Sequence, residues 1–237
     1  MTTFLEIDAI TKKFGGFIAL DNITITVGKG ERVGLIGPNG SGKSTMVNCL
    51  SGVFSPELGA IRFLGQDLRG LRAYERTRLG VARSFQLPKP FRSLTIAENV
   101  RVPLLYGRSP PKAIDEHCHD LLARVALQDK ADWLPASLTQ VELRKLELIR
   151  AVATEPKLLL ADEAMAGLSG SEVTEIVAFL RQLSTDGVTI IMIEHIMSAV
   201  MSFSDRLVVL VSGKKVADGD PQAVVKDPIV ESAYLGQ

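Results

Sequence analysis

The chain has 237 residues, of which 46% are hydrophobic and 23% are charged. These values are close to the average of globular domains, and they exclude a disordered or collagen-like chain. Lysine plus arginine and aspartate plus glutamate both total 27, so the net charge is zero and no nucleic-acid partner is expected. The length suits one domain, or one domain with a grafted lobe. A chain this long needs no disulfide or structural metal to fold.

Cysteine content and hydropathy favour a reducing compartment outside the membrane. Cys49 and Cys118 are too few for a disulfide framework. The first residues of the chain carry Glu6 and Asp8 and lack the apolar stretch of a secretory signal. The most apolar region, 188–211, is interrupted by charged residues, so no membrane span is expected. We therefore expect a cytosolic chain that serves a membrane only through a partner.

The first third of the chain has the pattern of short strands separated by glycine. Residues 4–10 and 23–27 alternate in polarity, 32–36 leads into a glycine-rich turn, and 60–64 is bounded by glycines. We expect each of these four segments to be a strand.

The remainder changes from a mostly helical stretch to alternating strands and helices. Residues 112–127 and 141–153 carry apolar side chains at helical spacing. Near-continuous apolar strands that alternate with helices indicate a parallel sheet covered on both faces. The stretch from about 88 to 150 breaks this alternation, and we interpret it as an inserted helical lobe. The later strands are predicted at 158–161, 188–193 and 207–211, and the later helices at 172–183 and 197–203.

A phosphate-loop motif follows the third predicted strand. Residues 37–44, GPNGSGKS, satisfy G-x-x-x-x-G-K-[ST] and precede a predicted helix at 45–50. Glycines let successive backbone N–H groups converge on phosphate oxygens, and the helix N-terminus adds a partial positive charge. Lys43 can reach the β- and γ-phosphates, and Ser44 can hold Mg²⁺. The sequence therefore predicts a nucleoside triphosphate bound by Gly37, Pro38, Asn39, Gly40, Ser41, Gly42, Lys43, Ser44 and Thr45.

Two adjacent carboxylates follow the apolar run 158–161. A carboxylate at the tip of a buried strand beside the phosphate loop is placed to hold the Mg²⁺ shell, and Asp162 has that position. Glu163 then projects toward the γ-phosphate and is the candidate that polarises water, help worth roughly 10²–10⁴-fold. The structural alternative is a solvated acidic pair, which the phosphate loop upstream makes the weaker interpretation.

These motifs together resemble the nucleotide-binding subunits of ABC transporters over essentially the whole chain. The resemblance implies an α/β P-loop NTPase fold with a RecA-like parallel core sheet, an antiparallel β portion and an inserted helical lobe at about 88–150. It implies one nucleotide-binding domain over residues 1–237 that hydrolyses ATP with Mg²⁺ as cofactor.

Three further site residues follow from the resemblance alone. Phe14 stands where the family places an aromatic that stacks on adenine. Gln86 matches the glutamine that senses Mg²⁺ and the attacking water, and His195 matches the histidine that contacts the γ-phosphate. The structural alternatives are an ordinary strand-end aromatic for Phe14 and a structural histidine for His195.

Finer features are similar to the subfamily that serves branched-chain amino acid uptake. They are residues 91–100, 194–197 and the ending from 218 to 236. The resemblance implies import of branched-chain amino acids or a related small solute through separate transmembrane permease subunits, with a solute-binding protein as an indirect partner. It places the chain peripherally at the cytoplasmic face of the plasma (inner) membrane. Lipopolysaccharide-export ATPases share much of this pattern and stay an alternative.

The segment that matches the family's signature, 138–142, departs from it. In the family two subunits meet head to tail, and a glycine-bearing signature at a helix N-terminus caps the γ-phosphate held by the other subunit. Here both glycine positions are lost, and Val141 puts a branched Cβ where the backbone approaches phosphate. Ala164 replaces a proline, and Ser169 replaces the Asp or Asn of the inter-subunit loop. We therefore expect a second ATP-binding subunit as partner, in a heterodimer with one competent and one degenerate site.

Two other functions compete with that of a transport ATPase. Val141 and Ser169 favour a regulatory subunit that binds nucleotide with little hydrolysis, whereas the retention of Glu163 and His195 speaks against it. A soluble ABC ATPase of DNA repair or translation is disfavoured by the zero net charge.

Two clusters of ionisable residues are interpreted as solvated surface. In 115–120, DEHCHD, consecutive helical residues point about 100° apart and cannot all face one ion. An arginine run is expected on a solvated helix face, with contact to an acidic partner as the weaker alternative; its members are Arg69, Arg72, Arg76, Arg78 and Arg83.

Overall fold

The computed structural model describes residues 3–107 and 113–235. The strands are β1 (Leu5–Phe14), β2 (Phe17–Val27), β3 (Arg32–Ile36), β4 (Leu58–Phe63), β5 (Gln66–Asp67), β6 (Val81–Ser84), β7 (Leu158–Asp162), β8 (Thr189–Ile193), β9 (Arg206–Val211) and β10 (Lys214–Gly219). The α-helices are α1 (Lys43–Ser51), α2 (Ala73–Leu79), α3 (Ile96–Tyr106), α4 (Ile114–Ala123), α5 (Gln140–Val152), α6 (Gly170–Thr185), α7 (Met197–Phe203), α8 (Pro221–Val224) and α9 (Pro228–Leu235). Short 3₁₀ turns cover Gln128–Lys130 and Pro135–Ser137.

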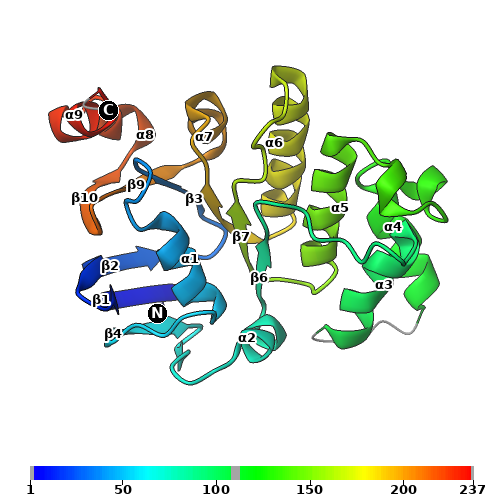
Figure 1. The fold of residues 1–237 in the computed structure, drawn as a ribbon, viewed down its shortest axis with the longest axis horizontal. Helices are drawn as coiled ribbons and strands as arrows, with labels where there is room; N and C mark the ends of the chain where they lie inside the picture. The colour runs from blue at the N-terminus through cyan, green and yellow to red at the C-terminus, as the bar shows by residue number, and fades with distance from the viewer. Residues whose placement is uncertain (1–2, 108–112, 236–237) are drawn as a thin grey trace.

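Two sheets organise the molecule (Figure 1). The larger has the strand order β10-β9-β3-β8-β7-β6, and its strands pair in parallel except for β10, which is antiparallel to β9. The smaller sheet, β2-β1-β4-β5, is antiparallel. This arrangement confirms the expected α/β fold with a parallel core sheet and an antiparallel portion.

The predicted elements are present, most with boundaries shifted by a few residues. The strand at 32–36 and the helix at 197–203 coincide with β3 and α7. The helix predicted at 112–127 is shorter, and residue 112 lies outside the described residues. The expectation that strand 207–211 closes the series is wrong, because β10 folds back on β9. The turn between them, Ser212 and Gly213, has positive φ at both residues (47° and 78°), which is the geometry of a tight hairpin.

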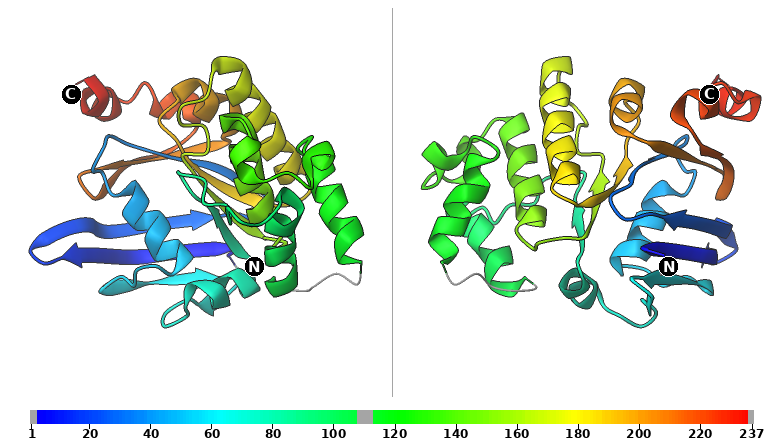
Figure 2. Two further views of the ribbon diagram at one scale, coloured as in Figure 1. Left: turned by 45° about the vertical axis from the view of Figure 1, so that its right-hand side comes forward. Right: turned by 180° about the vertical axis from the view of Figure 1, so that it is seen from behind.

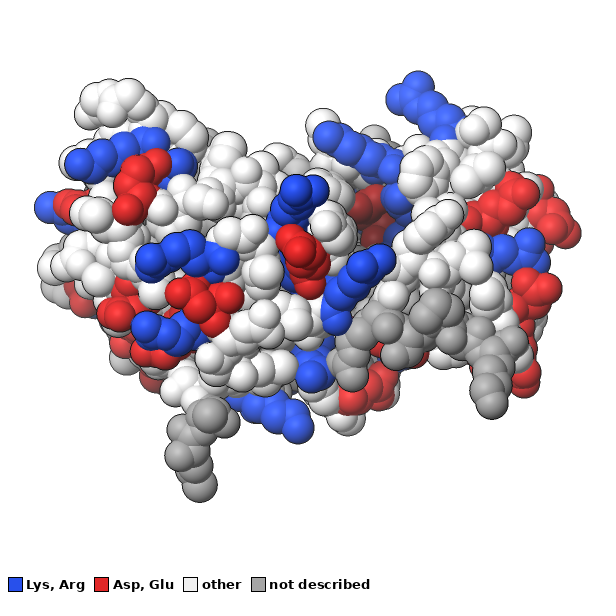
Figure 3. Space-filling model, turned by 90° about the horizontal axis from the view of Figure 1, so that it is seen from below, with Lys and Arg blue, Asp and Glu red and all other residues white. Residues whose placement is uncertain are grey.

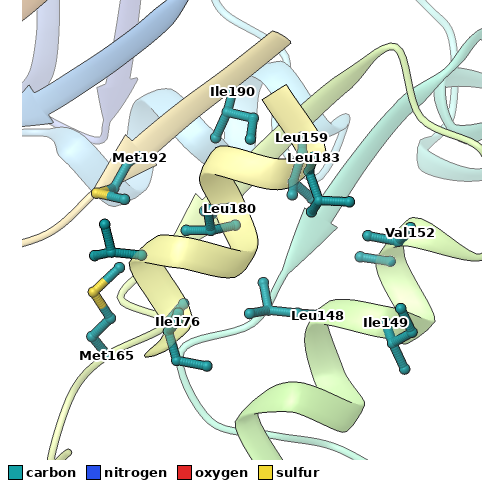
Figure 4. Packing of buried hydrophobic residues seen from close by; sticks show 14 of the residues in the cluster. Leu148, Ile149, Val152, Leu159, Met165, Ile176, Leu180, Leu183, Ile190 and Met192 are labelled. Carbon is teal, nitrogen blue, oxygen red and sulfur yellow. The ribbon is translucent and has the colours of Figure 1, made fainter. Parts of the chain in front are cut away.

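Apolar side chains of the core sheet alternate between two buried clusters. Leu158 and Leu160 of β7 pack in the cluster that contains α1 and the antiparallel sheet. Leu159 and Ala161 pack in the cluster that contains α5, α6 and α7. Because both faces of β7 are covered, its sequence is a continuous apolar run. Figure 4 shows part of the second cluster: Leu148, Ile149, Val152, Leu159, Met165, Ile176, Leu180, Leu183, Ile190 and Met192.

Helices α3, α4 and α5 come between β6 and β7 in the chain and gather at the end of the molecule opposite the antiparallel sheet (Figures 1 and 2). Their mutual contacts are those of α3 with α4 and with α5, and α5 also packs on β6 and β7. Helix α5 therefore joins this helical part to the core sheet. Within residues 3–107 and 113–235, no helix is both long enough and apolar enough to cross a membrane.

The solvated interpretation of the arginine run is wrong for two of its members. Arg83 lies on β6 rather than on a helix, and its guanidinium is paired with a carboxylate. Arg76 of α2 is 2% exposed, and its guanidinium donates to main-chain carbonyls of α1 and of the loop between β5 and α2. The acceptors are the carbonyl oxygens of Cys49, Leu50, Leu68 and Leu71.

Replacement of Arg76 should destabilise the fold, because it leaves these buried carbonyls without donors. We expect Arg76→Met to lower the free energy of unfolding by at least about 3 kcal/mol in urea denaturation. Arg78→Met, at an exposed position of the same helix, is the matched control and should stay within about 0.5 kcal/mol of the parent. Equal effects of the two substitutions would contradict the assignment.

Candidate functional site

The turn between β3 and α1 opens into a cavity of about 240 Å³. Residues 39–45 form one wall, and Phe14, Phe17 and Ala19 of the antiparallel sheet form another. Glu163, which follows β7, completes the lining. A larger cavity of about 580 Å³ lies between α6 and α7, but the smaller one carries the ionisable groups that chemistry requires.

The glycines of this turn are required by its geometry. A Cβ on Gly37 would lie 2.1 Å from the carbonyl oxygen of Leu210, and one on Gly42, at φ 105°, would lie 2.6 Å from that of Ala19. Ser41 is buried in the same turn, and its hydroxyl has no hydrogen-bond partner in the described structure. A backbone wound this tightly, with an unused buried hydroxyl, fits a phosphate group.

Lys43 lies at the centre of the turn. Its Nζ donates to the carbonyl oxygens of Gly37 at 2.6 Å and Pro38 at 2.9 Å. Burial lowers the pKa of the Lys43 ammonium, and the nearby carboxylates of Glu163 and Asp162 oppose that shift. The two acidic residues therefore lie within electrostatic reach of the phosphate loop.

Asp162 is buried at the end of β7 and is held from a neighbouring strand. Its Oδ2 accepts from Nη2 of Arg83 at 2.6 Å, and Nη1 of the same arginine donates to Oδ1 of Asn48 at 2.6 Å. Sequence reasoning missed Arg83 as part of the site. Its position directly after Val81 and Ala82 in a strand of the core sheet was the available signal, since a charge in a buried strand needs a partner.

Glu163 and Gln86 meet directly. Nε2 of Gln86 donates to Oε2 of Glu163 at 2.5 Å. Glu163 has a φ of 45°, uncommon for a residue with a side chain, and its N–H donates to the carbonyl oxygen of Ile193 at 2.8 Å. Backbone strain of this kind is concentrated at functional sites.

The donor chemistry of these residues fits Mg²⁺. Asp162 offers a carboxylate, Ser44 a hydroxyl and Gln86 an amide oxygen, which are the hard oxygen ligands that this ion prefers. Oδ2 of Asp162 is engaged by Arg83, so Oδ1 is the oxygen that stays available.

Phe14 lines the cavity, whereas His195 is not among its lining residues. Phe14 is 43% exposed at the cavity and packs edge to face on Phe54, with ring centroids 5.2 Å apart. His195 follows β8, its side chain is 62% exposed, and its Nδ1 lies 3.9 Å from Oε2 of Glu194. The structure places His195 at the same sheet edge as Glu163 without a direct contact between their side chains among the hydrogen bonds and ion pairs of the described residues.

Glu194 is a buried acid that sequence reasoning did not assign. Its Oε1 accepts from the N–H of Met165 at 2.8 Å, and its Oε2 is buried without a hydrogen-bond partner among the described residues. Burial raises the pKa of the Glu194 carboxyl, with the Met165 N–H and His195 opposing the shift. Glu194 directly precedes His195, and its hydrogen bond with Met165 joins this position to the segment that follows Glu163.

The segment 138–142 begins helix α5 outside the cavity. Thr139 is the N-cap: its Oγ1 accepts from the N–H of Glu142, and its own N–H donates to Oε2 of Glu142 at 3.0 Å. Oε1 of Glu142 is paired with Nζ of Lys130 at 2.5 Å. None of the described residues that line the cavity comes from this segment.

A glycine-built turn around a lysine, facing two strand-end carboxylates and a glutamine, defines a P-loop nucleotide-binding protein.

Comparison with known proteins gives the family. A family model described as ABC transporter matches residues 20–166. The chain is 35% identical to the high-affinity branched-chain amino acid transport ATP-binding protein BraF of Pseudomonas aeruginosa, over 98% of each chain. It is 32% identical to the lipopolysaccharide export system ATP-binding protein LptB of Acidithiobacillus ferridurans, over 100% of this chain and 98% of LptB.

Comparison with solved structures gives the same family. The ADP conformation of the ATP-binding cassette MJ1267 superposes with a TM-score of 0.90 at 30% identity, over the whole of both chains. This chain therefore belongs to the ABC transporter family, and it is an ABC ATPase with the nucleotide-binding fold of that family. The resemblance stated from the sequence is confirmed.

The buried Glu194 makes stability depend on pH. The pKa of this acid is raised by folding. Such a group contributes its full stability below its unfolded pKa, and this stability is lost as the pH rises through the folded pKa. The Glu194→Gln substitution would keep the acceptor for Met165 without the charge. We expect this variant to be more stable than the parent at pH 7.5, with the advantage shrinking toward pH 4, in urea denaturation. Glu116→Gln, at an exposed position of α4, is the control and should give a difference that does not change with pH; the same flat result for Glu194→Gln would refute the argument.

Proposed function

We propose that this chain is the ATP-hydrolysing subunit of an import system for branched-chain amino acids or a related small solute. The observation that carries the proposal is the contact between Gln86 and Glu163 at the phosphate-loop cavity. A carboxylate held there is placed to polarise the water that attacks the γ-phosphate. The identity to BraF over nearly the whole chain supports the solute class.

Each site residue would have its own role in ATP binding or hydrolysis. The turn 37–45 holds the phosphates, and Phe14 stacks on the adenine. Glu163 polarises water, and His195 contacts the γ-phosphate once nucleotide is bound. When bound, Mg²⁺ would neutralise charge on the β- and γ-phosphate oxygens, and its ligands in the protein would be Ser44, Gln86 and Asp162. The chain would work as one nucleotide-binding domain over residues 1–237, with 88–150 as the helical lobe.

A second ATP-binding subunit would complete the site. Among the described residues, the helix start at 138–142 does not line the cavity, so a donor segment would have to come from another chain. The helix start that this chain would offer its partner is a poor one, since Val141 carries a branched side chain and the Glu142 carboxylate is hydrogen-bonded to the Thr139 N–H. A heterodimer in which the partner contributes an intact signature follows from this asymmetry.

The permease subunits would dock between the core and the helical lobe, around residues 86–99. A cavity of about 230 Å³ lies in this region, with Phe85, Phe91 and Tyr106 among its lining residues. Leu87 and Tyr106 are 68% and 75% exposed, so apolar surface is available for a partner. Such docking would hold the chain peripherally at the cytoplasmic face of the plasma (inner) membrane, with a solute-binding protein as an indirect partner.

Two alternatives keep specific support. The identity to LptB favours export of lipopolysaccharide as a second candidate. The altered segment 138–142 favours a regulatory subunit with little hydrolysis. Basic and acidic side chains are interspersed on the face seen in Figure 3, which gives no support to a nucleic-acid partner.

The role of Glu163 can be separated from nucleotide binding. We expect Glu163→Gln to bind Mg-ATP with a Kd within about threefold of the parent in calorimetry, because the phosphate loop is unchanged. Turnover in the reconstituted transporter should fall by about 10²-fold or more. Lys43→Ala is the control that should lose binding itself. Unchanged turnover in Glu163→Gln would favour the regulatory alternative.

The altered signature should limit the chain when it is studied alone. We expect the purified chain to bind Mg-ATP but to hydrolyse it slowly, and Val141→Gly to raise that rate, because the backbone can then approach phosphate. ATP hydrolysis by the homodimer measures this. Rapid hydrolysis by the parent chain that does not respond to Val141→Gly would refute the asymmetric dimer.

A further inference from the structure

Helix α5 presents a row of ionic side chains to two loops of the site; Arg144 and Glu147 are buried and Arg150 is half-buried. Arg144, Glu147 and Arg150 recur at intervals of three residues, so they share one face of the helix. The glutamine loop, residues 85–89, follows β6 and contains Gln86. The acid loop, residues 163–169, follows β7 and begins with Glu163.

Arg144 bridges these two loops. Its Nη1 donates to the carbonyl oxygen of Gln86, and its Nη2 donates to that of Ala166 at 3.1 Å. The side chain is 8% exposed. Burial lowers the pKa of the guanidinium, and the carboxylates of Glu194, Glu147 and Glu163 oppose that shift, so acidic groups lie around it. The planar fork of arginine suits this task, because it can serve two carbonyls at once.

Glu147 and Arg150 hold the same glutamine loop further along. Glu147 is 5% exposed, and its two oxygens accept from the N–H groups of Phe85 at 3.4 Å and Lys89 at 3.3 Å. Nη1 of Arg150 donates to Oε2 of Glu147 at 3.1 Å and to the carbonyl oxygen of Lys89 at 2.9 Å. The loop is therefore held by its main chain at both ends, while the side chain of Gln86 is left to contact Glu163.

We propose that Arg144 is a positioning residue that sets the distance between Gln86 and Glu163. It contacts neither side chain and fixes the main chain that carries the first and the segment that follows the second. This inference rests on the proposed hydrolysis at Glu163. In the proposed dimer the first residues of α5 would face a partner subunit. Through Arg144, the same helix contacts the two loops that carry this chain's Gln86 and Glu163.

A structural role alone would predict a different response. If Arg144 only filled buried space, its loss would loosen α5 generally and lower stability in proportion to activity. If it positions the pair, its loss should loosen the two loops and reduce turnover while Mg-ATP binding, which depends on residues 37–45, is retained.

The test compares Arg144→Met with Lys145→Met in the full chain. Lys145 is the next residue of α5, and its partner is Glu175 of α6, so this control removes a charge without touching either loop. Hydrogen exchange without nucleotide is expected to rise at least tenfold in residues 85–89 and 163–169 of Arg144→Met and to stay unchanged in the control. Calorimetry should give a Kd for Mg-ATP within about threefold of the parent, and kcat in the reconstituted transporter should fall at least tenfold.

Two further variants separate positioning from folding. Gln86→Ala combined with Arg144→Met should reduce kcat by less than the product of the two single effects, because both substitutions act on the same Gln86–Glu163 pair. Arg144→Lys keeps the charge but has a single donor nitrogen in place of the guanidinium fork, so it should restore part of the loop protection and part of kcat, and it remains usable if Arg144→Met does not fold. Additive losses of kcat, or exchange that rises throughout α5 rather than in the two loops, would overturn the proposal. Failure of the parent chain to bind Mg-ATP would instead overturn the proposed function, and the exchange data without nucleotide would still report the loop contacts.

Discussion

The register of the parallel sheet is the constraint on which the site depends. Leu35 of β3 and Asp162 of β7 both lie opposite Ile193 of the intervening β8. Three strands therefore end at one level, and the residues that follow them converge: the phosphate loop after β3, Glu163 after β7 and His195 after β8. A slip of one residue in any pairing would turn these side chains toward the opposite face of the sheet. The continuous burial of β7 and β8 on both faces makes such a slip costly.

Buried ionic groups at this edge lie in networks in which most polar atoms have partners. Arg83 serves both Asn48 and Asp162, and Arg144 serves the main chain of two loops. A charge buried without such partners would cost several kcal/mol, so these contacts also select one arrangement of the loops. Nε of Arg83 and Oε2 of Glu194 are among the buried atoms that have no hydrogen-bond partner within the described residues. Oε2 of Glu194 lies 3.9 Å from Nδ1 of His195, and Oε1 of the same carboxyl accepts from the N–H of Met165 in the acid loop.

The sequence predicted those parts of the molecule whose signal is local. The phosphate loop is a contiguous motif, and Asp162 and Glu163 directly follow an apolar strand, so both could be placed without tertiary information. The partners of buried charges could not be predicted from the sequence, because Arg144 lies 58 residues from Gln86 and Arg83 lies 79 residues from Asp162. Propensity indicates only that an arginine is polar, and the fold decides whether it is solvated. Strand β10 was missed for a related reason: it is half-exposed and polar, and its pairing with β9 is specified by a two-residue turn rather than by its own composition.

The two ends of α5 differ in what their polar groups contact. At its start, the Glu142 carboxylate accepts from the N–H of Thr139, and its own N–H is capped by the Thr139 hydroxyl, so donors that a phosphate would need are already used. Further along, the row from Arg144 to Arg150 is intact and engaged with the glutamine loop. A chain that had abandoned hydrolysis would have no use for a buried arginine that spans Gln86 and Ala166, since an apolar side chain would fill that space at lower cost. In the proposed asymmetric dimer, this row would hold the Gln86–Glu163 pair of the chain that supplies the hydrolytic acid, while the altered helix start would serve its partner poorly.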